Sequence, residues 1–153
     1  MVMDTTYRTN KHGLYLFQII ATTALNTAFI VGQVFLSSED TEAYLFALEW
    51  LRQIYHFCGL VAPGTVTIDK CDALISALGI VFPQVPRLIC VWHINKNVEA
   101  HARKLFKAKT VEAEGQEVAT ARVNTLVGRQ LERFRQGWHK VLYATSIRDF
   151  ELA

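Results

Sequence analysis

With 153 residues, 51% of them hydrophobic and 20% charged, the chain is long enough for one domain with a sizeable core and too apolar for wholesale disorder. The net charge is only +2, but residues 101–153 carry 10 Lys and Arg against 6 Asp and Glu, a bias that suits phosphate binding or a solvated helical surface. The apolar runs are too short and too broken by Gln and Thr for a membrane span, and the first residues do not follow the pattern of a secretory signal.

The N-terminal third of the chain predicts three consecutive strands. Runs at 1–7, 16–24 and 28–36 are rich in β-branched and aromatic residues, which pack well on a pleated surface. The residues "LNT" at 25–27 predict a hairpin turn between the second and third runs.

A helix is expected over residues 39–57, where apolar residues recur at helical spacing. Ser37 and Ser38 are the candidate caps of its N-terminus. The acidic residues that follow them suit the positive end of the helix dipole.

A strand, a helix and a strand follow at 65–69, 72–82 and 86–93, and the last is expected to be buried. Such a unit implies parallel neighbouring strands joined by a right-handed crossover.

The C-terminal part of the chain is expected to be helical. Two helices are predicted over 94–109 and 116–143, with a break at "AEGQ", and a further short helix in the tail "TSIRDFELA". The segment 110–143 is thus a helical region before the last helix. The whole chain is predicted to be a single α/β domain, residues 1–153, with a ribonuclease-H-like mixed five-stranded sheet flanked by helices.

Two aspartates stand on otherwise apolar strands, Asp4 in the first and Asp69 at the end of the fourth. If these strands are neighbours, the two carboxylates face one point at one edge of the sheet, a layout that binds hard divalent cations. With a third acid, such a site supports two-metal phosphoryl transfer. The alternative, favoured by spacing alone, is that both acids are ordinary strand-end residues.

Cys90 and His93 have the spacing of half a zinc site. A zinc site needs a second matching pair, and the sequence contains none, so we do not expect zinc here. A buried cysteine beside a polar histidine is the favoured interpretation. The three cysteines, Cys58, Cys71 and Cys90, show no disulfide framework and indicate a reducing compartment.

Four blocks together resemble the transposase domain of Mutator-like elements: "MDTTYRTN", "TIDKCDALISALGIVFPQVP", "CVWHINKN" and the late "WHKVLYATSIRDFE". In that family the first block carries an aspartate, the second carries another before "FP", and the third follows the pattern C-x-W-H-x-x-x-N. The similarity runs from residue 1 to about 109 and continues more weakly to the end.

The resemblance implies a ribonuclease-H-like core that cuts and joins DNA with two divalent metal ions, Mg²⁺ or Mn²⁺. Asp4 and Asp69 match the first two catalytic, metal-binding aspartates, and Glu151 is assigned the third role. Cys90 and His93 match the family's C-x-x-H signature. DNA, as transposon ends and target, is the expected partner, homodimer formation is left open, and a nuclear location is expected.

The third acid has alternatives in Asp149 and Glu132, because Ile147 occupies the family's earlier glutamate position. The short lead before Asp4 and the end two residues after Glu151 predict a truncated core, and this core is expected to be inactive if the third ligand belongs at the position of Ile147. Two hypotheses follow. The chain is either the catalytic core of a transposase or a domesticated, non-catalytic DNA-associated regulator or dimerisation domain of the same fold.

Overall fold

The computed structural model describes residues 1–8, 10–114 and 120–148. They form two compact units, Met1–His93 and Ile94–Ala153. The expectation of a single domain over residues 1–153 stays a prediction. Within the described ranges, no helix combines the length and the apolar character needed to cross a membrane.

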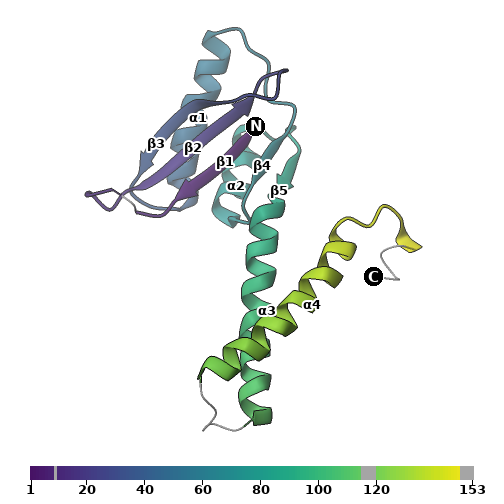
Figure 1. The fold of residues 1–153 in the computed structure, drawn as a ribbon. Coiled ribbons are helices and arrows are strands. Elements are labelled where there is room, and N and C mark those ends of the chain that lie inside the picture. The colour runs from purple at the N-terminus through teal and green to yellow at the C-terminus, as the bar shows by residue number, and fades with distance from the viewer. Residues whose placement is uncertain (9, 115–119, 149–153) are drawn as a thin grey trace. The chain divides into compact units, whose positions relative to one another are not determined.

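Three antiparallel strands open the first unit: β1 (Val2–Thr6), β2 (Tyr15–Thr22) and β3 (Ala28–Leu36). They confirm the predicted meander (Figure 1). The hairpin turn between β2 and β3 includes Asn26 at φ 60°, a left-handed conformation that asparagine tolerates better than most residues.

Helix α1 (Thr41–Phe57) follows the meander, as predicted. The predicted serine caps are wrong, because the cap is Asp40, whose Oδ1 accepts a hydrogen bond from the Ala43 N–H at 2.8 Å. Ser38 instead donates its hydroxyl to Asp40 Oδ2 at 2.6 Å. Ser38 therefore stabilises the capping carboxylate from a position before the helix begins.

The remaining elements of the first unit are β4 (Val66–Ile68), helix α2 (Asp72–Val81) and β5 (Arg87–Ile89). Strand β4 runs parallel to both β1 and β5, so the sheet order is β3-β2-β1-β4-β5. Helices α1 and α2 pack against each other on one side of this sheet (Figure 1). The predicted α/β class and mixed, ribonuclease-H-like five-stranded sheet are confirmed.

The prediction of a buried strand over residues 86–93 is wrong in two respects. Strand β5 is only three residues long and exposed, because it lies at the edge of the sheet and pairs with the equally short β4. The chain then enters helix α3 (Val91–Glu114), so His93 lies in the first turn of a helix.

The main core lies between the sheet and the two helices α1 and α2. Its most deeply buried large side chains are Met3, Phe17, Ile19, Tyr44, Leu48, Val66, Ile68 and Leu78. Alternate residues of β1 and β2 point into this core, as the two-residue period of a strand requires. The residues between them, Asp4 among them, point to the opposite face.

The second unit contains most of α3 and helix α4 (Thr120–Leu142). Ala102 of α3 clusters with three buried residues of α4, namely Val123, Val127 and Leu131. The rings of Phe106 and Phe134 meet edge to face with centroids 6.0 Å apart. The two predicted helices are confirmed, with α3 extending beyond its predicted bounds. Most of the predicted tail helix lies outside the described residues.

Candidate functional site

Asp4 and Asp69 lie at the same edge of the sheet because their strands are neighbours. Met3 of β1 pairs directly with Ile68 of β4 in a parallel register. Asp4 and Asp69 each come one residue later, at the carboxyl ends of the two paired stretches. The expected adjacency of the first and fourth strands is therefore confirmed, whereas the catalytic roles of the two residues stay predictions.

Local hydrogen bonds hold both carboxylates in place. Asp4 Oδ1 accepts from the Thr5 N–H at 2.9 Å, and Asp69 Oδ1 accepts from the Lys70 N–H at 2.6 Å. Both side chains are about half exposed, at 49% and 41%. Exposure spares them the desolvation cost that a buried charge would carry. Each carboxylate therefore stays accessible to a ligand.

The ring of His93 lies between the two aspartates. Its Nε2 lies 3.9 Å from Asp4 Oδ1, and its Nδ1 lies 3.9 Å from Asp69 Oδ1. Within the described part of the chain, the buried Nδ1 has no hydrogen-bond partner. These separations exceed hydrogen-bonding distance, so the ring stands between the acids without a direct bond to either. A buried polar atom of this kind requires an explanation, and a bound ligand or water is one.

A small hollow of about 50 Å³ opens beside the aspartates. Its lining consists of Met3, Asp4, Thr5, Glu39, Tyr44, Asp69, Cys71 and Leu74. Glu39 adds a third acidic residue to this lining, although its position in the sequence indicated only a residue at a helix N-terminus. Its chain distance from both aspartates left no sequence signal by which to group it with them.

Tyr44 connects this hollow to the core. Its hydroxyl shares a hydrogen bond with Thr5 Oγ1 at 3.0 Å and approaches Cys71 Sγ at 4.0 Å. Burial raises the pKa of the Tyr44 hydroxyl far above its usual value, with a smaller contribution from the nearby Cys71. Tyr44 is therefore neutral at physiological pH, and it ties β1 to α1 and α2 one residue beyond Asp4.

The donor atoms fit a divalent cation in kind. Carboxylate oxygens are the ligands that Mg²⁺ and Mn²⁺ prefer. The set of ligands is incomplete, because no group of three His, Cys, Asp or Glu side chains among the described residues is arranged to hold a metal. The predicted third acid, Glu151, and its substitute Asp149 lie outside the described residues. The other substitute, Glu132, lies on α4 in the second unit, 3.4 Å from Arg135.

Cys90 follows β5 and extends its pairing by one residue, because its backbone N–H donates to the Ile68 carbonyl at 2.8 Å. Its thiol is free, as are those of Cys58 and Cys71. Cys90 thus lies at the point where β5 gives way to the helix that carries His93. A chemical role for its thiol stays untested.

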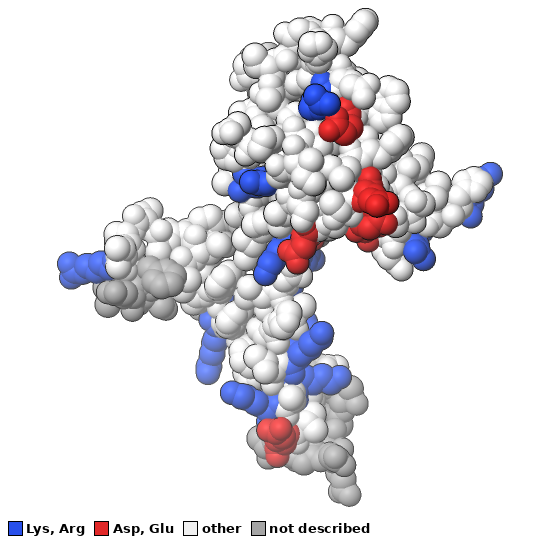
Figure 2. Space-filling model, turned by 180° about the vertical axis from the view of Figure 1, so that it is seen from behind, with Lys and Arg blue, Asp and Glu red and all other residues white. Residues whose placement is uncertain are grey.

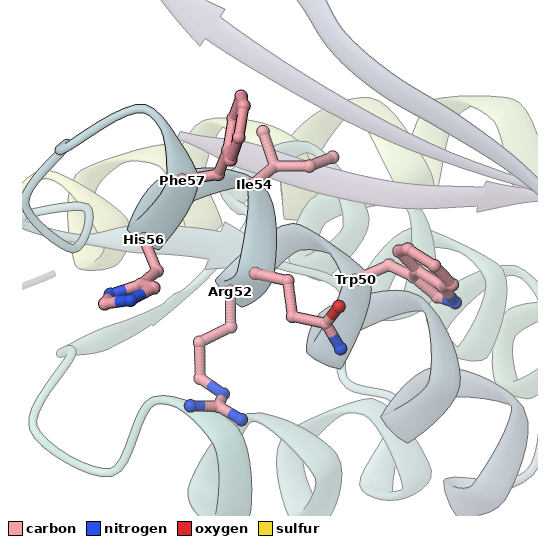
Figure 3. A pocket seen from close by; sticks show the side chains of 6 residues that line it. Trp50, Arg52, Ile54, His56 and Phe57 are labelled. Atoms are coloured by element: carbon pink, nitrogen blue, oxygen red, sulfur yellow. The ribbon is translucent and has the colours of Figure 1, made fainter.

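A larger hollow of about 450 Å³ lies along the second half of α1 (Figure 3). Its lining is mostly apolar, with Trp50, Ile54 and Phe57, and it includes the cationic Arg52. No carboxylate contributes to it. This larger hollow therefore offers no carboxylate ligand to a divalent cation.

The sheet and its paired edge carboxylates define a ribonuclease-H-like domain. The chain belongs to the MULE transposase domain family, whose sequence pattern matches residues 1–97. Both aspartates and His93 lie inside the matched segment, and the resemblance to Mutator-like transposases is confirmed.

A second comparison finds similarity to a PKS-NRPS hybrid synthetase cheA from Chaetomium globosum. The two sequences are 26% identical over 107 residues, which are 70% of this chain. The chain spans only 2% of the length of that protein. The match therefore concerns a small part of the synthetase.

Proposed function

We propose that this chain is the catalytic core of a Mutator-like transposase that cleaves DNA strands and joins them to a target. The observation that carries the proposal is the position of Asp4 and Asp69 on adjoining parallel strands, on either side of His93, within the segment that matches the transposase family. Family membership supports a transposase-related function. The sheet edge that carries Asp4 and Asp69, which we call the acidic edge, provides a place for the chemistry.

Asp4 and Asp69 would hold a divalent cation, Mg²⁺ or Mn²⁺. When bound, the cation supplies charge neutralisation and activation of the attacking oxygen in phosphodiester cleavage. The backbone N–H groups of Thr5 and Lys70 would keep one oxygen of each carboxylate oriented, while the other oxygen remains for the ligand. His93, whose ring stands between the two carboxylates, would limit how closely they approach each other.

The proposed reaction has two steps. Water first attacks a phosphodiester, so that a P–O bond to the water oxygen forms while the P–O3′ bond breaks, which leaves a 5′-phosphate and a free 3′-hydroxyl. That hydroxyl then attacks a phosphodiester of the target strand, so that one P–O bond forms and another breaks. Both steps act on DNA, which is accordingly the proposed partner, with the nucleus as the proposed location.

Cleavage of a labelled DNA duplex in Mg²⁺ or Mn²⁺ tests the proposal. The variants Asp4→Asn and Asp69→Asn are each expected to lower the rate about 10³-fold or more, because they remove ligand charge where the transition state needs it. Glu42→Gln, an exposed acid of α1, is the matched control and is expected to cleave normally.

The same experiment separates the two hypotheses drawn from the sequence. Cleavage that depends on both aspartates supports the catalytic one. Wild-type chain that binds Mn²⁺ and DNA without nicking any strand supports the non-catalytic regulator instead. Cleavage unchanged in both aspartate variants would refute the proposed site.

A further inference from the structure

Helix α4 has two faces of opposite character. One face carries the buried Val123, Val127 and Leu131 that pack on α3. The other face carries the exposed cationic residues Arg122, Arg129, Arg133 and Lys140. These four follow one another at intervals of 7, 4 and 7 residues, which places them within about 20° of a single line at 3.6 residues per turn. We call this line the α4 basic stripe.

Three of the four stripe residues lack the partners that an ordinary solvated helix face has. Such faces usually interleave acids and bases at intervals of three or four residues. Over the described residues 120–148 the only acid is Glu132, and its carboxylate lies 3.4 Å from Arg135. Arg129, Arg133 and Lys140 form no ion pair with any described residue. Their charges are available to an external anion.

Arg135 shows the contrast on the same helix. It lies on the side of α4 that faces α3, where it forms ion pairs with Glu99 and Glu132. The Glu99 carboxylate raises the pKa of Arg135, and Arg135 in turn lowers the pKa of Glu99. Arg135 thus serves the contact between the helices, whereas Arg129, Arg133 and Lys140 form no ion pair with any described residue.

The burial pattern favours a polyphosphate over a lipid surface. A membrane-binding amphipathic helix inserts its apolar face among the acyl chains. Here the apolar face of α4 is occupied by Ala102 and Phe106 of α3. Only the cationic face is left to meet a partner, and on the face drawn in Figure 2 Lys and Arg side chains line the helices of this unit.

We propose that the α4 basic stripe binds the phosphate backbone of double-stranded DNA. The inference rests on the proposed function, because it takes DNA as the partner, and it names the surface that holds it. Eighteen residues separate Arg122 from Lys140. At 1.5 Å per residue the stripe is about 27 Å long, enough to follow about eight base-pair steps of 3.4 Å. Contacts of this kind are independent of base sequence.

Equilibrium binding of the full chain to a labelled duplex, measured over a series of salt concentrations, tests this inference. The triple variant Arg129→Gln, Arg133→Gln, Lys140→Gln is expected to lower the slope of log affinity against log salt by about 3, since each phosphate contact contributes about 0.9. At 0.1 M salt its affinity is expected to fall about 10- to 100-fold.

The matched control removes equal charge from the other helix. Lys104, Lys107 and Lys109 of α3 are exposed, and their joint replacement by Gln is expected to keep most of the affinity. Equal losses in the two triple variants would show that net charge alone governs binding, and would overturn the stripe. Tighter binding to anionic phospholipid vesicles than to the duplex would overturn it as well.

Two further variants keep the test decisive. Replacing Arg129 and Arg133 by Lys preserves charge and is expected to preserve affinity, so a loss of affinity there would contradict a purely electrostatic contact.

Asp4→Asn is expected to abolish cleavage and leave DNA binding intact. If the wild type binds DNA through the stripe but never cleaves it, the catalytic proposal fails and this inference stands. If cleavage occurs and the stripe variant binds normally, the reverse holds.

Discussion

Removal of one hydroxyl from the core should disturb the edge of the sheet that carries Asp4. In Tyr44→Phe the ring stays in place, but Thr5 Oγ1 loses its partner at 3.0 Å. Tyr44 is 1% exposed, and the hollow of about 50 Å³ that it lines together with Thr5 is the route by which water could replace the lost partner. The net loss of a hydrogen bond costs about 0.5–1.5 kcal/mol, and an unsatisfied buried group raises that to about 1–3 kcal/mol. We therefore expect a decrease of about 1–2 kcal/mol in the free energy of unfolding.

Urea unfolding followed by circular dichroism measures this loss, and Tyr55→Phe is the matched control. Tyr55 lies on the same helix, is partly buried and forms no hydrogen bond through its hydroxyl with any described residue. Its replacement is expected to change the free energy of unfolding by less than about 0.5 kcal/mol. Equal effects of the two substitutions would refute the reasoning, because the Thr5 contact would then contribute nothing beyond ring packing.

Three further predictions follow from the same structure. Asp40→Ala is expected to lower the thermal stability of the chain at pH 7. Asp40→Asn is expected to lower it much less, because Asn also caps helices, and thermal denaturation measures both effects. Ser38 and the Ala43 N–H lower the pKa of Asp40, so its carboxylate's stabilisation is present above about pH 4 and is lost as the pH falls through the lowered folded pKa. Leu131→Ala is expected to cost about 2–5 kcal/mol in urea unfolding, because this side chain is 2% exposed; a loss below 1 kcal/mol would contradict the packing of α4. His93→Ala is expected to weaken Mn²⁺ binding about 10- to 100-fold in calorimetric titration, and unchanged affinity would exclude a positioning role.

The sequence predicted well where one residue pattern had one structural meaning. The runs that became β2 and β3 are long, β-branched and aromatic, so only a strand suited them. Asp4 and Asp69 were placed together only on the condition that the first and fourth strands are neighbours, and the parallel pairing of β1 with β4 meets that condition.

Prediction failed where tertiary contacts chose between equivalent local options. Residues 86–93 have the composition of a strand, but β4 offers only three residues for pairing, so β5 ends at Ile89 and the chain continues as a helix. No Ser, Thr, Asp or Asn stands directly before Val91 to signal that start. Glu39 was missed for a related reason, since only the folded chain brings it to the aspartates.

The distribution of charge assigns cleavage and DNA affinity to different parts of the chain. Asp4 and Asp69 must stay anionic to hold a cation, and anionic groups repel the phosphates on which they would act. Residues 1–93 carry 5 Lys and Arg against 7 Asp and Glu, so the sheet unit offers no surplus of positive charge to offset that repulsion. Attraction must then come from elsewhere, and the α4 basic stripe is a surface on which Arg129, Arg133 and Lys140 form no ion pair with any described residue. Because exposed charges are screened beyond about 8 Å at physiological salt, the stripe must touch the DNA to contribute. Substitutions in the stripe should therefore change how much DNA is bound, while substitutions at the acidic edge change what happens to it.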